Sequence, residues 1–206
     1  FAQAKSWFSL ALAAARRFTR EVGESFQSGA LSALEELSLT NCAPDLTAES
    51  TMDMAKGMAL APVDSVRNLQ VLRLRGYALG GFEGGVALLT AFTGMNSTQD
   101  GRWAGLRVLD LSDNLLGDIG VERLSESMAA GVFGSALEEL DLSLNRHIRR
   151  SQQSTIGPAG IRALVNALQA RRGEDGEGAR GIRLKRLRLG GQYLRDDGVA
   201  ELVAGW

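Results

Sequence analysis

The chain has 206 residues, of which 45% are apolar and 23% carry charge, as is usual for a soluble globular domain. Its formal net charge of −1 provides no global field that would attract nucleic acid or an anionic membrane, so neither partner is favoured. No apolar run approaches the roughly 18 residues of a membrane span, so membrane insertion is not expected.

The first thirty residues leave two interpretations open. We favour a helix over residues 1–30 that precedes the first strand. Its apolar residues would be Trp7, Phe8, Leu12, Phe18 and Val22. The alternative is an organellar transit peptide, because basic residues but no acid precede Glu21. The single cysteine cannot form an internal disulfide, which favours an intracellular protein. The cytoplasm is therefore the expected compartment, and a mitochondrion or plastid is the alternative.

Leucine then recurs at the first, fourth and sixth positions of five segments, of which Leu106-Arg-Val-Leu-Asp-Leu-Ser-Asp-Asn114 is typical. The Leu-x-Leu alternation has a period of two, which places those leucines on one face of a strand. The sequence therefore predicts five strands, near residues 36–40, 71–75, 108–112, 139–143 and 186–190.

Between these strands the apolar spacing becomes that of a helix. Residues 47–60 are typical of a long helix, and a turn over 80–85 is expected to lead into a helix around 86–92. Asp118 is a candidate N-cap for the next helix, and Pro158 suits the start of the one after it. The remaining segments are expected to be loops: residues 94–105, the link between Asn145 and Gly160, and residues 171–183.

The five segments resemble the leucine-rich repeat pattern L-x-x-L-x-L-x-x-N/C-x-L. Gly117-Asp-Ile-Gly-Val-Glu-Arg-Leu124 resembles the ribonuclease-inhibitor-like subclass in particular. The resemblance implies an α/β fold: a right-handed solenoid, or horseshoe, with parallel strands on the concave face and helices on the convex face. Residues 1–206 would form a single array. Neither end carries a polar capping unit, so the chain is expected to be an excerpt of a longer one.

The ninth position of the pattern is held by Cys42, Asn114 and Asn145, whose side chains are expected to point inward. In the family, asparagines at this position bond the backbone of the turn and of neighbouring repeats. Tyr77 and Gln192 depart from the pattern, so the turns at these two positions are expected to be less regular.

Residues between the core leucines should point into the concave face, where a partner could bind. Arg73 is expected to pair with Asp110, and Arg188 with Asp141, across neighbouring strands. Such pairs could simply support the sheet, or they could form a two-signed docking surface. The candidate residues on this face are Arg73, Arg75, Asp110, Glu139, Asp141, Arg186 and Arg188. A basic loop adds His147, Arg149 and Arg150 as candidates for gripping an acidic partner.

No catalytic constellation accompanies this surface. The one histidine, His147, has no second histidine, catalytic cysteine or acidic cluster at a ligand-like spacing, so no enzyme activity, metal, cofactor or small-molecule substrate is predicted. The sequence favours a non-catalytic protein-interaction scaffold, with the subunits of a large assembly as candidate partners. The alternatives are a regulator of an enzyme in trans (a GTPase activator or a NOD-like-receptor-type sensor) and the substrate-reading part of a ubiquitin ligase.

Overall fold

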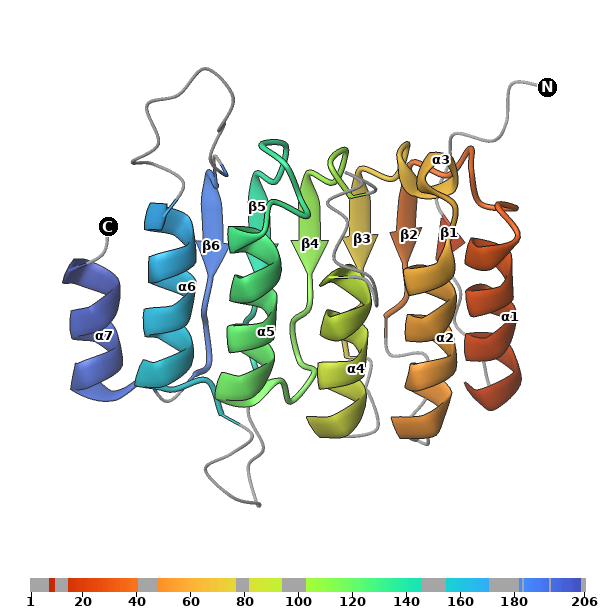
Figure 1. The fold of residues 1–206 in the computed structure, drawn as a ribbon. Coiled ribbons are helices and arrows are strands. Elements are labelled where there is room, and N and C mark those ends of the chain that lie inside the picture. Colours follow the sequence, from red (N-terminus) through yellow and green to blue (C-terminus); the bar gives the residue numbers. More distant parts are fainter. Residues whose placement is uncertain are drawn as a thin grey trace.

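The computed structural model describes residues 8–9, 15–40, 48–76, 82–93, 103–145, 155–170, 182, 184–192 and 194–204. Strands and helices alternate along these residues (Figure 1). The strands are β1 (Phe8–Ser9), β2 (Glu36–Ser38), β3 (Val71–Arg73), β4 (Val108–Asp110), β5 (Glu139–Asp141) and β6 (Arg186–Arg188). The helices are α1 (Ala15–Gln27), α2 (Ala48–Leu60), α3 (Val63–Val66), α4 (Phe82–Thr93), α5 (Gly117–Ala129), α6 (Pro158–Ala170) and α7 (Arg195–Ala204).

The strands form one sheet, in which they follow one another in chain order and all neighbours are parallel. The five predicted strands are confirmed, each as a shorter element of three residues. Backbone bonding between neighbours continues past the strand ends, as from the Leu74 N–H to the Asp110 carbonyl and from the Asp113 N–H to the Ser143 carbonyl. Consecutive segments therefore stack as whole turns, which is why the sequence pattern extends beyond the strands themselves.

The helices form one layer that covers one face of the sheet (Figure 1). Apart from the single-turn α3, each helix packs against the next helix in the chain. The central leucine of each strand from β2 to β5 lies between the layers and is at most 4% exposed. The architecture is thus α/β with an all-parallel sheet, and its repetition is consistent with an α/β solenoid. No helix among the described residues is long and apolar enough to cross a membrane.

The core differs at the last strand. Leu187 and Leu189 of the β6 segment pack only partly into the core, whereas their counterparts Leu140 and Leu142 on β5 are at most 1% exposed. Among the described residues no strand follows β6 in the sheet, and a side chain in a stacked array is covered from both sides only where a neighbour follows.

The prediction for residues 1–30 was wrong in part. Phe8, expected on the helix, lies in β1 and pairs with Leu37 of β2. The described helix begins at Ala15, and its Phe18 and Val22 are buried as expected. The error arose because the two strand residues have no Leu-x-Leu spacing that would separate them from a helix. Trp7 and Leu12 lie outside the described residues.

One other expectation also needs correction. Helix α4 begins at Phe82, so the second half of the predicted 80–85 turn is helical. Of residues 94–105, predicted to be a loop, the structure describes 103–105, which form a turn as expected, with Trp103 completely buried at the start of the β4 repeat. A bulky indole can fill the space between helix layer and sheet at a turn, and nothing in the local pattern distinguishes such a residue from an exposed one. Helices α2 and α6 match their predicted starts closely.

Asparagine side chains cross-link consecutive repeats. Asn145 donates to the carbonyls of Leu111 and Leu142 at 2.9 Å each, and its Oδ1 accepts from the backbone N–H groups of Asn114 and Leu116. Asn114 likewise donates to the Leu74 carbonyl, one repeat earlier, at 2.6 Å. Both side chains are completely buried, so the inward orientation expected for them is confirmed.

Part of the irregularity expected at Gln192 is observed, because its buried side-chain Oε1 has no hydrogen-bond partner among the described residues, whereas the Asn145 Oδ1 accepts two backbone N–H groups. One bond of the pattern is nevertheless kept at Gln192. Its Nε2 donates to the Leu142 carbonyl at 2.6 Å, as an asparagine at that position would do to the preceding repeat. The longer amide reaches the same backbone group. Cys42 and Tyr77, the other residues considered at this position, lie outside the described residues.

Asp118 was predicted to cap its own helix, and this was wrong. It lies inside the first turn of α5, and the residue at the N-cap is Leu116, which makes no side-chain cap bond. The Asp118 carboxylate instead accepts from the N–H groups of Gly157 and Gly160, at 2.6 and 2.9 Å, where α6 begins. One repeat therefore caps the next: a carboxylate from α5 satisfies N–H groups at the positive end of the α6 dipole.

Replacing Asp118 by alanine should accordingly lower the free energy of unfolding by about 1–2 kcal/mol, because two N–H groups lose their acceptor. Asp118→Asn keeps one side-chain oxygen and should lose less than half of that amount. Urea unfolding followed by circular dichroism would measure both. Equal losses in the two variants would show that the carbonyl-type acceptor is not what stabilises this junction.

Candidate interaction surface

The side of the sheet opposite the helices carries most of the predicted site residues. We call it the open face. Its strand residues are Glu36, Ser38, Val71, Arg73, Val108, Asp110, Glu139, Asp141, Arg186 and Arg188, and Thr40, Arg75, Ser112, Ser143 and Gly190 continue its rows past the strand ends. Alternation of burial along each strand places these side chains away from the buried leucines.

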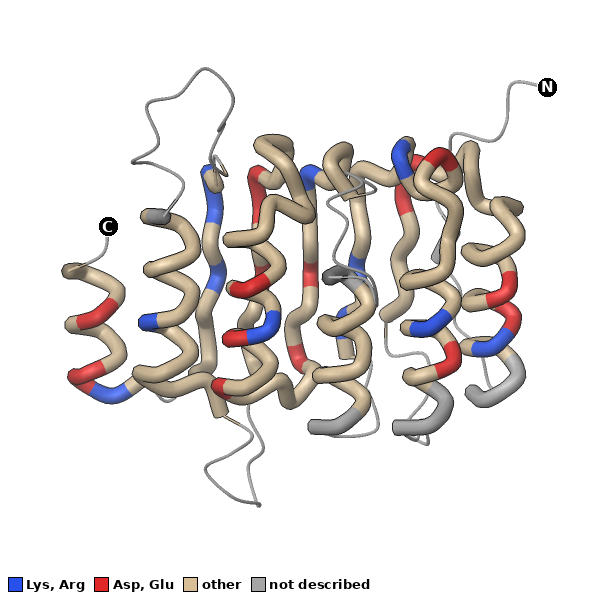
Figure 2. Tube along the Cα trace, viewed as in Figure 1, with Lys and Arg blue, Asp and Glu red and all other residues tan. Residues whose placement is uncertain are grey.

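The register aligns these side chains in rows across the sheet. Ser38, Arg73, Asp110, Asp141 and Arg188 are consecutive partners in one row. Glu36, Val71, Val108, Glu139 and Arg186 form the parallel row beside it. Both rows are those expected from the leucine pattern. Figure 2 shows the consequence for charge: the strands β2, β4 and β5 carry acidic residues, and β3 and β6 carry basic ones.

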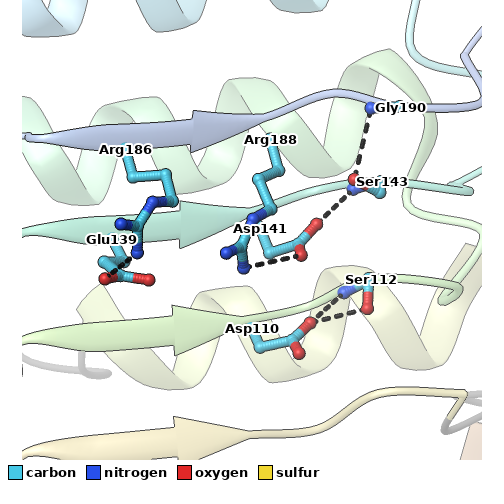
Figure 3. A network of polar contacts seen from close by, with 8 residues as sticks. All are labelled: Asp110, Ser112, Glu139, Asp141, Ser143, Arg186, Arg188 and Gly190. Atoms are coloured by element: carbon cyan, nitrogen blue, oxygen red, sulfur yellow. Dashed lines mark hydrogen bonds and ion pairs between the residues drawn. The ribbon is translucent and has the colours of Figure 1, made fainter.

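Three arginines of the open face form ion pairs with the preceding strand. Arg188 lies 3.6 Å from the Asp141 carboxylate, which confirms that predicted pair, and Arg186 contacts Glu139 in the same way (Figure 3). The predicted pair of Arg73 with Asp110 is wrong, since Arg73 turns back to Glu36 on β2. An arginine side chain can reach the strand on either side, so strand spacing alone does not decide the partner.

Asp110 bonds to its own strand end instead of to an arginine. Its Oδ1 accepts from the Ser112 N–H at 2.9 Å and from the Ser112 hydroxyl at 2.6 Å (Figure 3). Asp141 accepts from the Ser143 N–H in the same manner, and the Ser143 hydroxyl then accepts from the Gly190 N–H. These local bonds fix both carboxylates at the end of their strands.

A second set of charges, which sequence reasoning did not select, lies just before the strands. Glu138 accepts from Lys185 at 2.9 Å and from Arg107 at 3.2 Å, and thus joins the segments of β4, β5 and β6. These two hydrogen bonds, with Lys185 the stronger influence, hold the pKa of Glu138 below its usual value. The signal was available: these residues follow the first leucine of each repeat and so align with one another.

Charges on the helix layer form separate pairs. Arg162 of α6 donates to Glu201 of α7 at 2.9 Å, which lowers the pKa of Glu201 and raises that of Arg162. This pair joins two neighbouring helices and is remote from the open face, as expected for a contact that supports stacking.

Arg75 is exposed in the row beyond the strand end, beside Ser112. All seven candidates predicted on the strand side thus lie on the open face, and the structure brings five of them together around β4 to β6. The basic-loop candidates His147, Arg149 and Arg150 lie outside the described residues. Within the described part of the chain, no group of three or more His, Cys, Asp or Glu could hold a metal ion.

The open face therefore presents charges of both signs in a fixed order across the sheet. Comparison with known proteins adds no assignment: no protein-family model matches the chain, and no curated protein is found to be similar to it.

Proposed function

We propose that the chain is a right-handed leucine-rich repeat solenoid of the ribonuclease-inhibitor-like kind and acts as a non-catalytic scaffold for binding proteins. The open face would be its concave, partner-binding surface. The family proposal is supported by the leucine register and by the asparagine bonds between repeats.

The observation that carries the function is the make-up of the open face. Five strands present aligned side chains that are polar or charged at most positions and half-buried or exposed, and beneath β2 to β5 the central leucines are fully packed. A rigid surface with charges of both signs in fixed order suits recognition of a folded or extended protein, since complementary charge sets register and excludes wrong partners. The subunits of a larger assembly would be partners of this kind.

Site-specific photo-crosslinking of the protein in cells of its native source would test this proposal. A photoreactive residue replaces Val108 on the open face in one variant, and the exposed Arg123 of α5 on the helix layer in the other. We expect a reproducible set of crosslinked proteins from position 108 and not from position 123. The same products from both positions, or products from position 123 alone, would contradict binding at the open face.

Charge reversal gives the quantitative form of the test. Asp110→Arg should weaken binding of the crosslinked partner by about tenfold or more, because it reverses a charge inside the contact. Glu122→Arg makes the same change on α5 and should leave affinity unaltered. Equal losses of affinity in the two variants would mean that only the overall charge of the protein matters, which would contradict binding at the open face.

A further inference from the structure

The charges of the open face do not all find partners within the sheet. Its acids are Glu36, Asp110, Glu139 and Asp141, and its bases are Arg73, Arg75, Arg186 and Arg188. Three arginines each take the acid of the preceding strand, which leaves one residue of each sign. Among the residues that the structure describes, Asp110 and Arg75 form no ion pair.

The position of Asp110 explains why it is left over. Every paired acid of the open face has an arginine opposite or diagonal to it on the next strand, but the residue opposite Asp110 on β5 is Asp141, another carboxylate (Figure 3). The arginine opposite on the other side, Arg73, is engaged by Glu36. A cation that completed the pattern would therefore have to come from outside the sheet.

Arg75 lies diagonally from Asp110. The register pairs Arg73 with Asp110, so Arg75, two residues further along, stands beside Ser112. The Ser112 N–H and hydroxyl occupy the Asp110 oxygen that faces the strand end. On the other side of Asp110, Val71 and Val108 are half-buried register partners that provide an apolar patch. An acid (Asp110), a base (Arg75) and an apolar patch (Val71 and Val108) thus lie next to one another on the open face.

The distance between Asp110 and Arg75 limits which partner could pair with both of them at once. Diagonal neighbours on adjacent strands are about 7–8 Å apart. Residues two positions apart in an extended peptide are separated by about 6.6 Å and point to the same side. One extended segment can therefore place a side chain on each charge, provided that the two side chains carry opposite charge.

We propose that the open face binds an extended segment of a protein partner in which an arginine and an acidic residue stand two positions apart. The arginine lies against Asp110, the carboxylate that has no arginine of its own, with its aliphatic stem on Val71 and Val108. The acidic residue pairs with Arg75. This inference rests on the proposed function, since it specifies what the open face recognises.

Immobilised random decapeptides with three fixed central residues would serve as the probe. The fixed cores are Arg-x-Glu, Glu-x-Arg, Arg-x-Arg, Glu-x-Glu and the uncharged Gln-x-Gln. We expect one of the two mixed orders to bind at least about tenfold more tightly than Gln-x-Gln, as measured by fluorescence anisotropy of the selected peptides. Equal affinity for all five cores, or a preference for a like-charged core, would overturn the inference.

Three variants then locate the contacts. Asp110→Asn should abolish the preference for arginine and keep that for glutamate, whereas Arg75→Gln should do the reverse. Asp113→Asn is the matched control: it removes the same charge from an exposed residue in the following turn, at a left-handed φ of 61° that asparagine tolerates. Thermal unfolding by circular dichroism establishes that all three fold.

The outcomes separate this inference from the function on which it rests. If Asp113→Asn weakens binding as much as Asp110→Asn, the charges act at long range and the inference fails, while photo-crosslinking from position 108 still supports the scaffold. If the selected peptides crosslink only from position 123, both the inference and the binding role of the open face fail.

Discussion

Replacing Asn145 by alanine is expected to lower the free energy of unfolding by about 4 kcal/mol. The completely buried amide serves four backbone groups at once, two as donor and two as acceptor. Alanine leaves the N–H groups of Asn114 and Leu116 without that acceptor in the interior, and each unsatisfied buried group costs about 1–3 kcal/mol. The loss also removes the link between the β4 and β5 repeats.

Urea unfolding followed by circular dichroism would measure this effect, with Asn166→Ala as the matched control. Asn166 is exposed on α6, so the same substitution there should change stability by less than about 0.5 kcal/mol. If both alanine variants unfold at similar urea concentrations, the buried asparagines are not what holds consecutive repeats together, and packing of the leucines alone would have to account for it.

Much of this fold could be predicted from the sequence because one physical period controls it. Leucines at alternating positions must share one face, so the rows of the open face could be predicted from them, and the two rows within the strands appear in the observed register. The same reasoning placed α2 and α6, since their apolar spacing is helical and their starts are marked by suitable residues.

The parts that sequence reasoning missed depend on contacts between repeats. Whether Arg73 takes Glu36 or Asp110 is a choice between two carboxylates at similar reach, and the pattern assigns no preference. Asp118 acts on the neighbouring helix, at a sequence separation of 39 to 42 residues, whereas capping rules consider only the residue's own helix. β1 consists of two residues, too few to show any period.

A pair of glycines also depends on contact between neighbouring repeats, and a substitution there is expected to have a large effect on stability. Gly57 of α2 lies against the backbone of Gly23 in α1, so closely that a Cβ at either position would meet main-chain atoms of the other helix. For Gly23 the nearest atom would be the Asp53 carbonyl oxygen, 2.7 Å away. Main-chain atoms cannot turn aside as a side chain can, so the helices would have to separate.

Gly57→Ala should therefore lower the free energy of unfolding by about 3 kcal/mol, as overpacking of a close contact does. The direction of the change in the free energy of unfolding distinguishes the two effects, because helix propensity alone would make the same substitution stabilising by about 1 kcal/mol. Gly198→Ala in α7 is the control: its Cβ would meet the Leu194 side chain at 3.2 Å and no main-chain atom of another element nearer than 3.8 Å, so any loss should be far smaller than at Gly57.

Hydrogen exchange would show where the Gly57→Ala penalty falls. In a stacked array each repeat contacts only its neighbours, so α1 should lose protection while α5 and α6 keep theirs. Uniform loss of protection along the chain would mean that the array unfolds as one cooperative unit. Unchanged or increased stability would mean that α1 and α2 do not approach each other through Gly23 and Gly57. If α1 alone is released, the open face from β3 to β5 should still bind its partner, because the contacts proposed for it lie beyond the junction of α1 and α2.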